Sequence, residues 1–225
     1  MLLSIKGHAT LLLIVVFGCK SGLKDNHRVW NKYSGDYSGS KYSSLTQINS
    51  ENVHRLDTVW TYCSGDMRES PPTTIQCNPV ISKGVMYITT PALKIVALRA
   101  GTGREIWKYD PFEGEGASGT NRGVTLWSRG NEQRVYFVAG SFLYALNAKN
   151  GLPVPTFGVG GKVDLYEGLG RDVWATWVTA ATPGVIYRDL IIMGTTLGEG
   201  PAPAAPGHIR AYNIHTGEMQ WIFHT

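Results

Sequence analysis

One phrase of eleven residues recurs along this chain, and it restricts the fold more than any other feature. Two copies are nearly regular and a third is degenerate: "ALRAGTGREIW" (Ala97 to Trp107), "AYNIHTGEMQW" (Ala211 to Trp221) and "ALNAKNGLPVPTF" (Ala145 to Phe157). Their turn glycines, Gly103, Gly151 and Gly217, lie 48 and then 66 residues apart. Self-similarity on this scale is typical of repeat architectures.

Each copy has the pattern of a tight hairpin. An Ala-Leu or Ala-Tyr pair ends one strand, Thr-Gly or Asn-Gly forms the turn, and an aromatic side chain follows on the next strand. Glycine is needed where the turn requires positive φ. We expect the small alanine to leave room for a tryptophan of the neighbouring repeat. Repeats of about fifty residues with four short strands are the blades of a β-propeller.

The rest of the chain supports an all-β fold. Short runs rich in Val, Ile and Tyr lie between Gly, Pro and Asn, as in "GVMYITT" (84–90), "RVYFVAG" (134–140) and "GVIYRDLIIMG" (184–194). This pattern predicts strands and hairpins. The chain has 43% hydrophobic residues, 27 Gly and 7 Trp, a composition that argues against disorder. Three blades do not close a propeller, so we expect a fragment of a longer protein.

The first residues have the pattern of an export signal. Lys6 precedes an apolar stretch from Leu11 to Phe17 that is too short to span a bilayer, and Gly18-Cys19 closes it. The sequence "VFGC" resembles a bacterial lipobox, in which Cys19 would carry the lipid. We therefore expect a lipoprotein-type signal peptide at 1–18 and the propeller part at 19–225. A non-lipidated signal with a chance cysteine is the alternative.

The other cysteines, the histidines and the charge exclude some kinds of site. Cys63 and Cys77 either pair in an oxidising compartment or stay free, and the sequence does not decide between these states. The six His show no metal-ligand spacing, which gives no support for a zinc site. The formal net charge is +4 and the basic residues are scattered, so no nucleic-acid partner is expected.

Arg122 stands out as a candidate functional residue. In "SGTNRGVTLW" (118–127) it lies between a predicted turn and an apolar strand. A guanidinium there either points to solvent or faces an anion. The nearby "GEGASG" (114–119) matches G-x-G-x-x-G literally, but it does not lie between a strand and a helix, so no nucleotide site is expected.

Several motifs together resemble one family. The recurring phrase is similar to the tryptophan-docking motif of eight-bladed quinoproteins, the pyrroloquinoline quinone (PQQ) dehydrogenases. "WNKYSGDYSGSKYSSLTQINSENVHRLDTVW" (30–60) looks like that family's N-terminal segment, and "IIMGTTLGE" with "GHIRAYNIHTGEMQW" resembles its third-blade region. The resemblance covers about residues 30 to 225 and implies a partial eight-bladed β-propeller of about three blades.

The resemblance also implies a set of site residues. Arg122 matches the arginine that pairs with a carboxylate of PQQ, a role suited to a fixed fork of donors. Glu199 matches a Ca²⁺ ligand, and carboxylate oxygen suits that hard cation. Thr196 and Gly198 match cofactor-contacting positions, and Thr182 lies near a family threonine that bonds the cofactor. Gln76 stands where many members have Glu, so one expected charge is absent.

One further difference from the family pattern bears on the substrate class. The adjacent cysteine pair of the alcohol-oxidising members is missing, and "GEGAS" (114–118) occupies its place. This favours the membrane-associated branch typified by glucose dehydrogenase. The family's catalytic aspartate lies further along, so no catalytic residue is assigned in this chain, and the chain alone is expected to be inactive.

The implied function is PQQ- and Ca²⁺-dependent oxidation of a sugar or alcohol hydroxyl, with electrons passed to a quinone or cytochrome acceptor. The implied location is the periplasm, with a membrane anchor on Cys19. The alternative is a non-catalytic propeller lipoprotein that serves as a scaffold in outer-membrane protein assembly. Convergence of Gln76, Arg122 and Glu199 at one end of the propeller would favour the enzyme.

Overall fold

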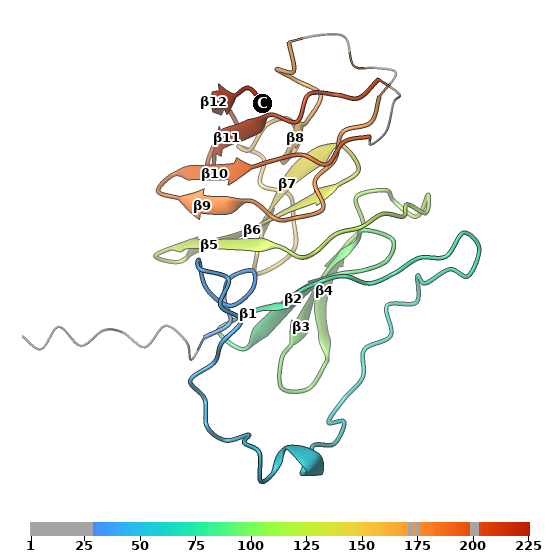
Figure 1. Ribbon diagram of the computed structural model, residues 1–225, viewed down its shortest axis with the longest axis vertical. Helices are drawn as coiled ribbons and strands as arrows, with labels where there is room; N and C mark the ends of the chain where they lie inside the picture. The colour runs from blue at the N-terminus through green and yellow to red at the C-terminus, as the bar shows by residue number, and fades with distance from the viewer. Residues whose placement is uncertain (1–28, 171–172, 174–175, 199–202) are drawn as a thin grey trace, which may run out of the picture.

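The structure is a computed structural model that describes residues 29–170, 173, 176–198 and 203–225. The described residues form three four-stranded antiparallel sheets, which lie one beside the next in Figure 1. A short 3-10 helix, η2 (Val53–Arg55), lies in the long segment before the first sheet. No helix in the described ranges has the length and apolarity that crossing a bilayer requires.

Each sheet is a meander whose strands pair in sequence order. Blade 1 contains β1 (Val80–Ser82), β2 (Val85–Thr89), β3 (Ile95–Arg99) and β4 (Glu105–Tyr109). Blade 2 contains β5 (Thr125–Arg129), β6 (Glu132–Ala139), β7 (Phe142–Asn147) and β8 (Lys162–Asp164). Blade 3 contains β9 (Val185–Tyr187), β10 (Leu190–Met193), β11 (Ile209–Asn213) and β12 (Met219–Phe223). The predicted blades are confirmed.

The predicted apolar runs are strands. The first two correspond to β2 and β6, whereas "GVIYRDLIIMG" contains both β9 and β10. The hairpin between these two strands turns at Arg188, whose φ is 55°. Cys63 is exposed and Cys77 is half-buried, and both are free thiols, which answers the question that the sequence left open.

The core lies between the sheets, and blade 2 is buried on both faces. Successive side chains of a strand point to opposite faces. On β6, Val135 and Phe137 accordingly pack in the core shared with blade 1. Tyr136 and Val138 pack in the core shared with blade 3. This explains why β6 has six consecutive buried residues instead of an alternating pattern.

The first strands of blades 2 and 3 lie next to each other. β5 contacts β9, and the Thr125 hydroxyl donates to the Gly184 carbonyl. The segment that precedes blade 1 pairs with the first strand of that blade, because the Ile81 N–H donates to the Trp30 carbonyl at 2.7 Å. The hydroxyl of Tyr37 donates to the Ile186 carbonyl at 3.3 Å. The N-terminal segment therefore bridges blades 1 and 3.

The blades dock through tryptophans and turn glycines, as the repeat predicts. Nε1 of Trp107 in blade 1 donates to the Ala148 carbonyl of blade 2 at 3.0 Å. Its indole ring covers Gly151, where an added Cβ would lie 2.5 Å from the ring. Trp60 covers Gly103 and donates to Ala100 in the same way, at 3.1 Å. The room for the Trp107 indole comes from the turn glycine, whereas Ala145, expected to provide it, packs in the core between blades 2 and 3.

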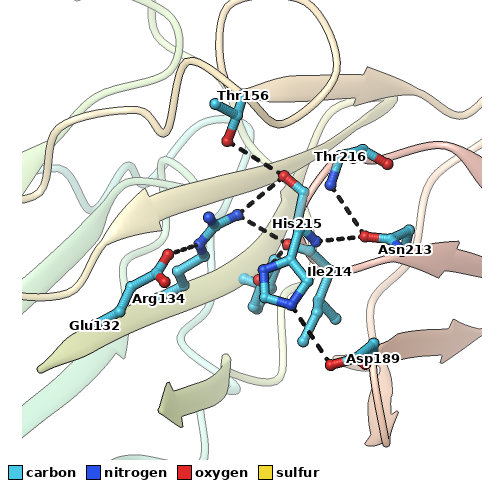
Figure 2. Close-up of polar contacts among 9 residues, drawn as sticks. Glu132, Arg134, Thr156, Asp189, Asn213, Ile214, His215 and Thr216 are labelled. Carbon is cyan, nitrogen blue, oxygen red and sulfur yellow. Dashed lines mark hydrogen bonds and ion pairs between the residues drawn. The ribbon is translucent and has the colours of Figure 1, made fainter. Parts of the chain in front are cut away.

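Blade 2 docks on blade 3 differently (Figure 2). No tryptophan covers Gly217, and the side chain of Val163 and the backbone of Gly158 fill that place. Nη1 of Arg134 donates to the carbonyls of Ile214 and His215 at 3.0 and 3.1 Å. The degenerate second copy of the repeat thus coincides with a polar contact between blades.

Candidate functional site

The residues just before the first strand of each blade form the candidate site. We call them the leading segments: 76–79, 121–124 and 181–184. Gln76 lies four residues before β1, Arg122 three before β5, and Thr182 three before β9. Because the three blades have the same topology, equivalent positions lie at the same end of the propeller.

Backbone hydrogen bonds join the three leading segments in a row. The Asn78 N–H donates to the Arg122 carbonyl at 2.9 Å, and Asn78 forms a parallel bridge with Gly123. The Arg122 N–H donates to the Ala181 carbonyl at 2.7 Å. The backbone of Arg122 is therefore bonded on one side to blade 1 and on the other to blade 3.

The side chain of Arg122 is free of this framework. It is exposed, and no hydrogen bond or ion pair joins its guanidinium to another of the described residues. Gln76 and Thr182 are also exposed. Arg122 thus has a backbone that is hydrogen-bonded on both sides and an exposed guanidinium. The neighbouring segments carry the exposed amide of Gln76 and the exposed hydroxyl of Thr182.

Thr196 lies beside the third leading segment. Its backbone exchanges two hydrogen bonds with Thr179, at 2.7 and 3.3 Å, and its hydroxyl accepts from the Ala181 N–H at 3.4 Å. The Thr179 hydroxyl donates to the Gly140 carbonyl at 2.6 Å, which joins this region to blade 2. Gly198 follows, with Nε1 of Trp177 3.6 Å from the position that a Cβ would take.

Thr196 lines a cavity of about 400 Å³ between blades 2 and 3. Thr120, Thr179 and Ala181 line it as well, together with Trp177. Sequence reasoning missed Thr120 and Thr179. Thr120 lies two residues before Arg122, and Thr179 is the first threonine of "TAATPGV", so adjacency to the motifs was the available signal.

Thr182 lines a different cavity. That cavity, of about 250 Å³, lies between the N-terminal segment 31–39 and the strands β5 and β9. It does not include Thr196, so the two predicted threonines do not share one cavity. Thr179 shares a cavity with Thr196 and Thr182 does not, which makes Thr179 the better placed of the two for a ligand near Thr196.

Cys77, the residue after Gln76, has a partly buried thiol whose pKa is shifted. The sulfur of Cys77 accepts from the Thr89 N–H at 3.2 Å, and burial raises the pKa of the Cys77 thiol. A raised pKa keeps this cysteine protonated near neutral pH, which makes it a structural group and a poor nucleophile.

The predicted metal ligand, Glu199, lies outside the described residues, as does Cys19. Within the ranges that are described, no three His, Cys, Asp or Glu side chains gather as they would around a metal ion. Backbone bonds place the leading segments of Gln76 and Arg122 side by side, whereas the convergence of their side chains with Glu199 stays a prediction.

The comparisons with known proteins show the family of the chain. Residues 30–225 match the family described as glucose/ethanol/alcohol dehydrogenase, β-propeller domain. Quinate/shikimate dehydrogenase (quinone) of Acinetobacter baylyi is 28% identical over 220 residues, which cover 86% of this chain and 27% of that protein. The dehydrogenase subunit of alcohol dehydrogenase (quinone) of Gluconobacter oxydans is 33% identical over 206 residues, with coverage of 87% and 24%.

A solved structure shows the same fold. The quinohemoprotein alcohol dehydrogenase from Comamonas testosteroni superposes with a TM-score of 0.70 at 28% identity. The match covers 89% of this chain and 28% of that one. The chain therefore spans about a quarter of the length of the relatives that it matches.

Proposed function

Because this chain belongs to the family of the glucose/ethanol/alcohol dehydrogenase β-propeller domain, we propose that it forms one wall of a PQQ site. The whole protein would oxidise a sugar or alcohol hydroxyl. One observation carries the proposal. Arg122 presents an exposed guanidinium from a backbone that is hydrogen-bonded to both neighbouring leading segments.

The side chains of the site suit an anionic quinone. PQQ has three carboxylates, and a guanidinium on a fixed backbone binds a carboxylate through two parallel hydrogen bonds. Among the described site residues, Gln76, Thr182 and Thr196 add neutral donors, and none of them adds a negative charge that would oppose the anion. When bound, PQQ supplies the two-electron acceptor for the oxidation.

Each residue then has a stated task. Arg122 would hold one carboxylate of the cofactor and set its orientation. The Gln76 amide would donate a hydrogen bond where many relatives carry a carboxylate, so this side of the site would be less negative. Thr196, paired with Thr179, would offer its hydroxyl from the wall of the cavity between blades 2 and 3.

The remaining parts of the proposal depend mainly on Glu199 and Cys19, which lie outside the described residues. Glu199 would ligate Ca²⁺ beside the quinone, and Gly198, directly before it in the chain, would allow close approach in the same turn. Export and a lipid on Cys19 would place the protein at a periplasmic membrane surface, with a quinone or cytochrome as electron acceptor. The catalytic base would come from blades beyond this chain, since none of its residues is assigned that role.

The substrate class is part of the proposal. "GEGAS" stands where alcohol-oxidising relatives have adjacent cysteines, which favours a sugar or polyol. Activity of the full-length protein with a panel of sugars, polyols and primary alcohols, with and without PQQ and Ca²⁺, tests this. Activity on primary alcohols alone would contradict the substrate class. The absence of any PQQ-dependent oxidation would favour the scaffold alternative.

A binding experiment tests the site itself. In the full-length apoprotein, Arg122→Gln should weaken PQQ binding by roughly 10- to 100-fold, since a hydrogen bond to a charged group contributes about 1.5–3 kcal/mol. Quenching of tryptophan fluorescence measures the affinity. Arg129, exposed at the opposite end of β5, supplies the matched control: Arg129→Gln should leave the affinity unchanged. Equal effects of both substitutions would refute a specific role for Arg122.

A further inference from the structure

Asn121, which no motif singled out, is the most completely bonded side chain of the leading segments. It is 6% exposed. We propose that Asn121 is a positioning residue that holds Arg122 in its cofactor-facing conformation. This inference rests on the proposed function of Arg122 but concerns a different side chain and a different physical effect.

The Asn121 amide joins two blades. Its Nδ2 donates to the Val138 carbonyl on β6 of blade 2 at 2.7 Å. Its Oδ1 accepts from the hydroxyl of Thr89, on β2 of blade 1, at 3.1 Å. Thr89 is itself only 1% exposed. An unbonded amide at such a buried position is unfavourable, so these contacts fix the side chain in one orientation.

The same amide closes a turn around Arg122. The Gly123 N–H donates to Oδ1 of Asn121 at 2.8 Å, two residues further along the chain. This is the side-chain turn that Asn characteristically forms with its own backbone. The ring of atoms closed by that bond contains the whole backbone of Arg122.

Gly123 completes the restraint. Its φ is +133°, and an added Cβ would lie 2.8 Å from the Asn78 carbonyl oxygen. A glycine is therefore needed for the close approach of this turn to the segment that carries Gln76. Within the turn, Asn121 and Gly123 are buried and Arg122 is exposed, so the guanidinium is the group that the turn presents outward.

Restraint of this kind favours binding because it removes alternative conformations before the ligand arrives. Without the Asn121 turn, Arg122 would keep its charge and exposure but would sample other backbone conformations. The affinity for an anionic cofactor would then fall, although Arg122 itself is unchanged.

A double-mutant cycle in the full-length protein separates positioning from a general structural role. Asn121→Ala should weaken PQQ binding by roughly 10-fold when Arg122 is present, and by less than about 2-fold in the Arg122→Gln background. A merely structural role would lower affinity equally in both backgrounds, and that result would overturn the inference.

A conservative variant provides the second test. The Asn121→Ser hydroxyl keeps an acceptor for the Gly123 N–H but does not reach Val138, so it should recover affinity to within about 3-fold of wild type while lowering Tm. If Asn121→Ala does not fold, Asn121→Ser in the two Arg122 backgrounds carries the test, with Tm recorded for each. Loss of affinity in Asn121→Ser as large as in Arg122→Gln would overturn the inference.

The two hypotheses fail in different ways. If wild type does not bind PQQ, or Arg122→Gln binds it as well as wild type does, the proposed function is wrong. If Arg122→Gln weakens binding but Asn121→Ala folds and binds like wild type, the proposed function stands and the positioning role of Asn121 is refuted.

Discussion

At the two blade junctions, side chains of one blade donate to equivalent backbone carbonyls of the next blade, but the donor groups differ. Ala148 of blade 2 and Ile214 of blade 3 each lie three residues before a turn glycine, Gly151 and Gly217. At the first junction, the Trp107 indole and the Tyr87 hydroxyl donate to Ala148, at 3.0 and 3.1 Å. At the second, Arg134 and the Tyr136 hydroxyl donate to Ile214, at 3.0 and 2.7 Å.

The difference lies in what accompanies the hydrogen bond. Trp107 is 9% exposed and adds a large buried ring, so its junction depends mainly on apolar burial. Arg134 makes a second bond to the His215 carbonyl and an ion pair with Glu132 at 2.6 Å, as Figure 2 shows. Since half of the Glu132 side chain is exposed, solvent screens this pair. The equivalent carbonyls thus accept from an indole at the first junction, which we call the aromatic clamp, and from a guanidinium at the second, the ionic clamp.

The largest expected effect comes from removing the aromatic clamp. Trp107→Ala should lower the free energy of unfolding by about 4 kcal/mol, because it leaves a cavity over Gly151 and removes one of the two donors to the Ala148 carbonyl. Trp107→Phe keeps much of the ring and should lose only about 1–2 kcal/mol. Urea unfolding of the full-length protein measures both, and an equal loss for the two variants would contradict the dominance of apolar burial.

The turn glycine under the ring should rank next. Gly151→Ala should destabilise by about 3 kcal/mol, since the new Cβ would lie 2.5 Å from the indole and φ is +73°. Gly130, with φ +59° and open space around it, is the control for the backbone effect alone. Gly130→Ala should therefore lose only about 1 kcal/mol. If the two glycine variants are equally stable, the close approach of the ring has no energetic consequence.

The ionic clamp should be weaker. Arg134→Met should lose about 1–2 kcal/mol, because Tyr136 and Thr156 still donate to the two turn carbonyls and Glu132 returns to water. Arg134→Lys should not restore the stability, since an ammonium lacks the fork that contacts Glu132 and both carbonyls. Thermal unfolding compares the two variants. Full recovery in Arg134→Lys would show that charge alone, and not geometry, matters here.

The smallest effect is a dependence on alkaline pH that both junctions share. Burial raises the pKa of Tyr136 and, by less, that of Tyr87. A raised pKa in the folded state means that the unfolded chain loses its protons first. Stability should therefore be intact below the ordinary tyrosine pKa of about 10 and fall as pH rises above it. Unfolding midpoints between pH 8 and 11 measure this loss.

Substitution identifies the source of that alkaline loss. Tyr136→Phe should flatten the decline more than Tyr87→Phe, because the pKa of Tyr136 is raised further. At neutral pH, each variant should cost about 1 kcal/mol for the lost hydroxyl bond. A decline above pH 10 that is unchanged in both variants would assign it to other groups.

Much of the fold was predictable because its signals are local. A turn glycine, a β-branched run and an aromatic on the next strand lie within about a dozen residues of one another, so each hairpin can be recognised from its own letters. The sequence showed that the second copy of the repeat differs from the other two. It did not show that Arg134 bonds Ile214 at the junction with blade 3, because these residues lie 80 positions apart in the sequence.

The candidate site was predictable to a different degree. The family resemblance predicted Arg122, Gln76 and Thr196 as site residues, and backbone bonds join the segments that carry them, whereas their roles stay predictions. Thr182 and Thr179 differ by three positions in one short motif, and only the cavity that each lines distinguishes them. Asn121 has no sequence signal of its own, since its partners Thr89 and Val138 lie in strands of two different blades.

The sequence by itself determined the kind of unit that folds: four-stranded blades, tight glycine turns and a docking tryptophan. These follow from steric limits on φ and from alternation along a strand, which act over a few residues. Only the tertiary structure decided which groups meet between blades: an indole on Gly151, a guanidinium on the Ile214 carbonyl, and the amide that closes the turn around Arg122. Packing of distant segments against one another creates those contacts, and no single segment encodes them.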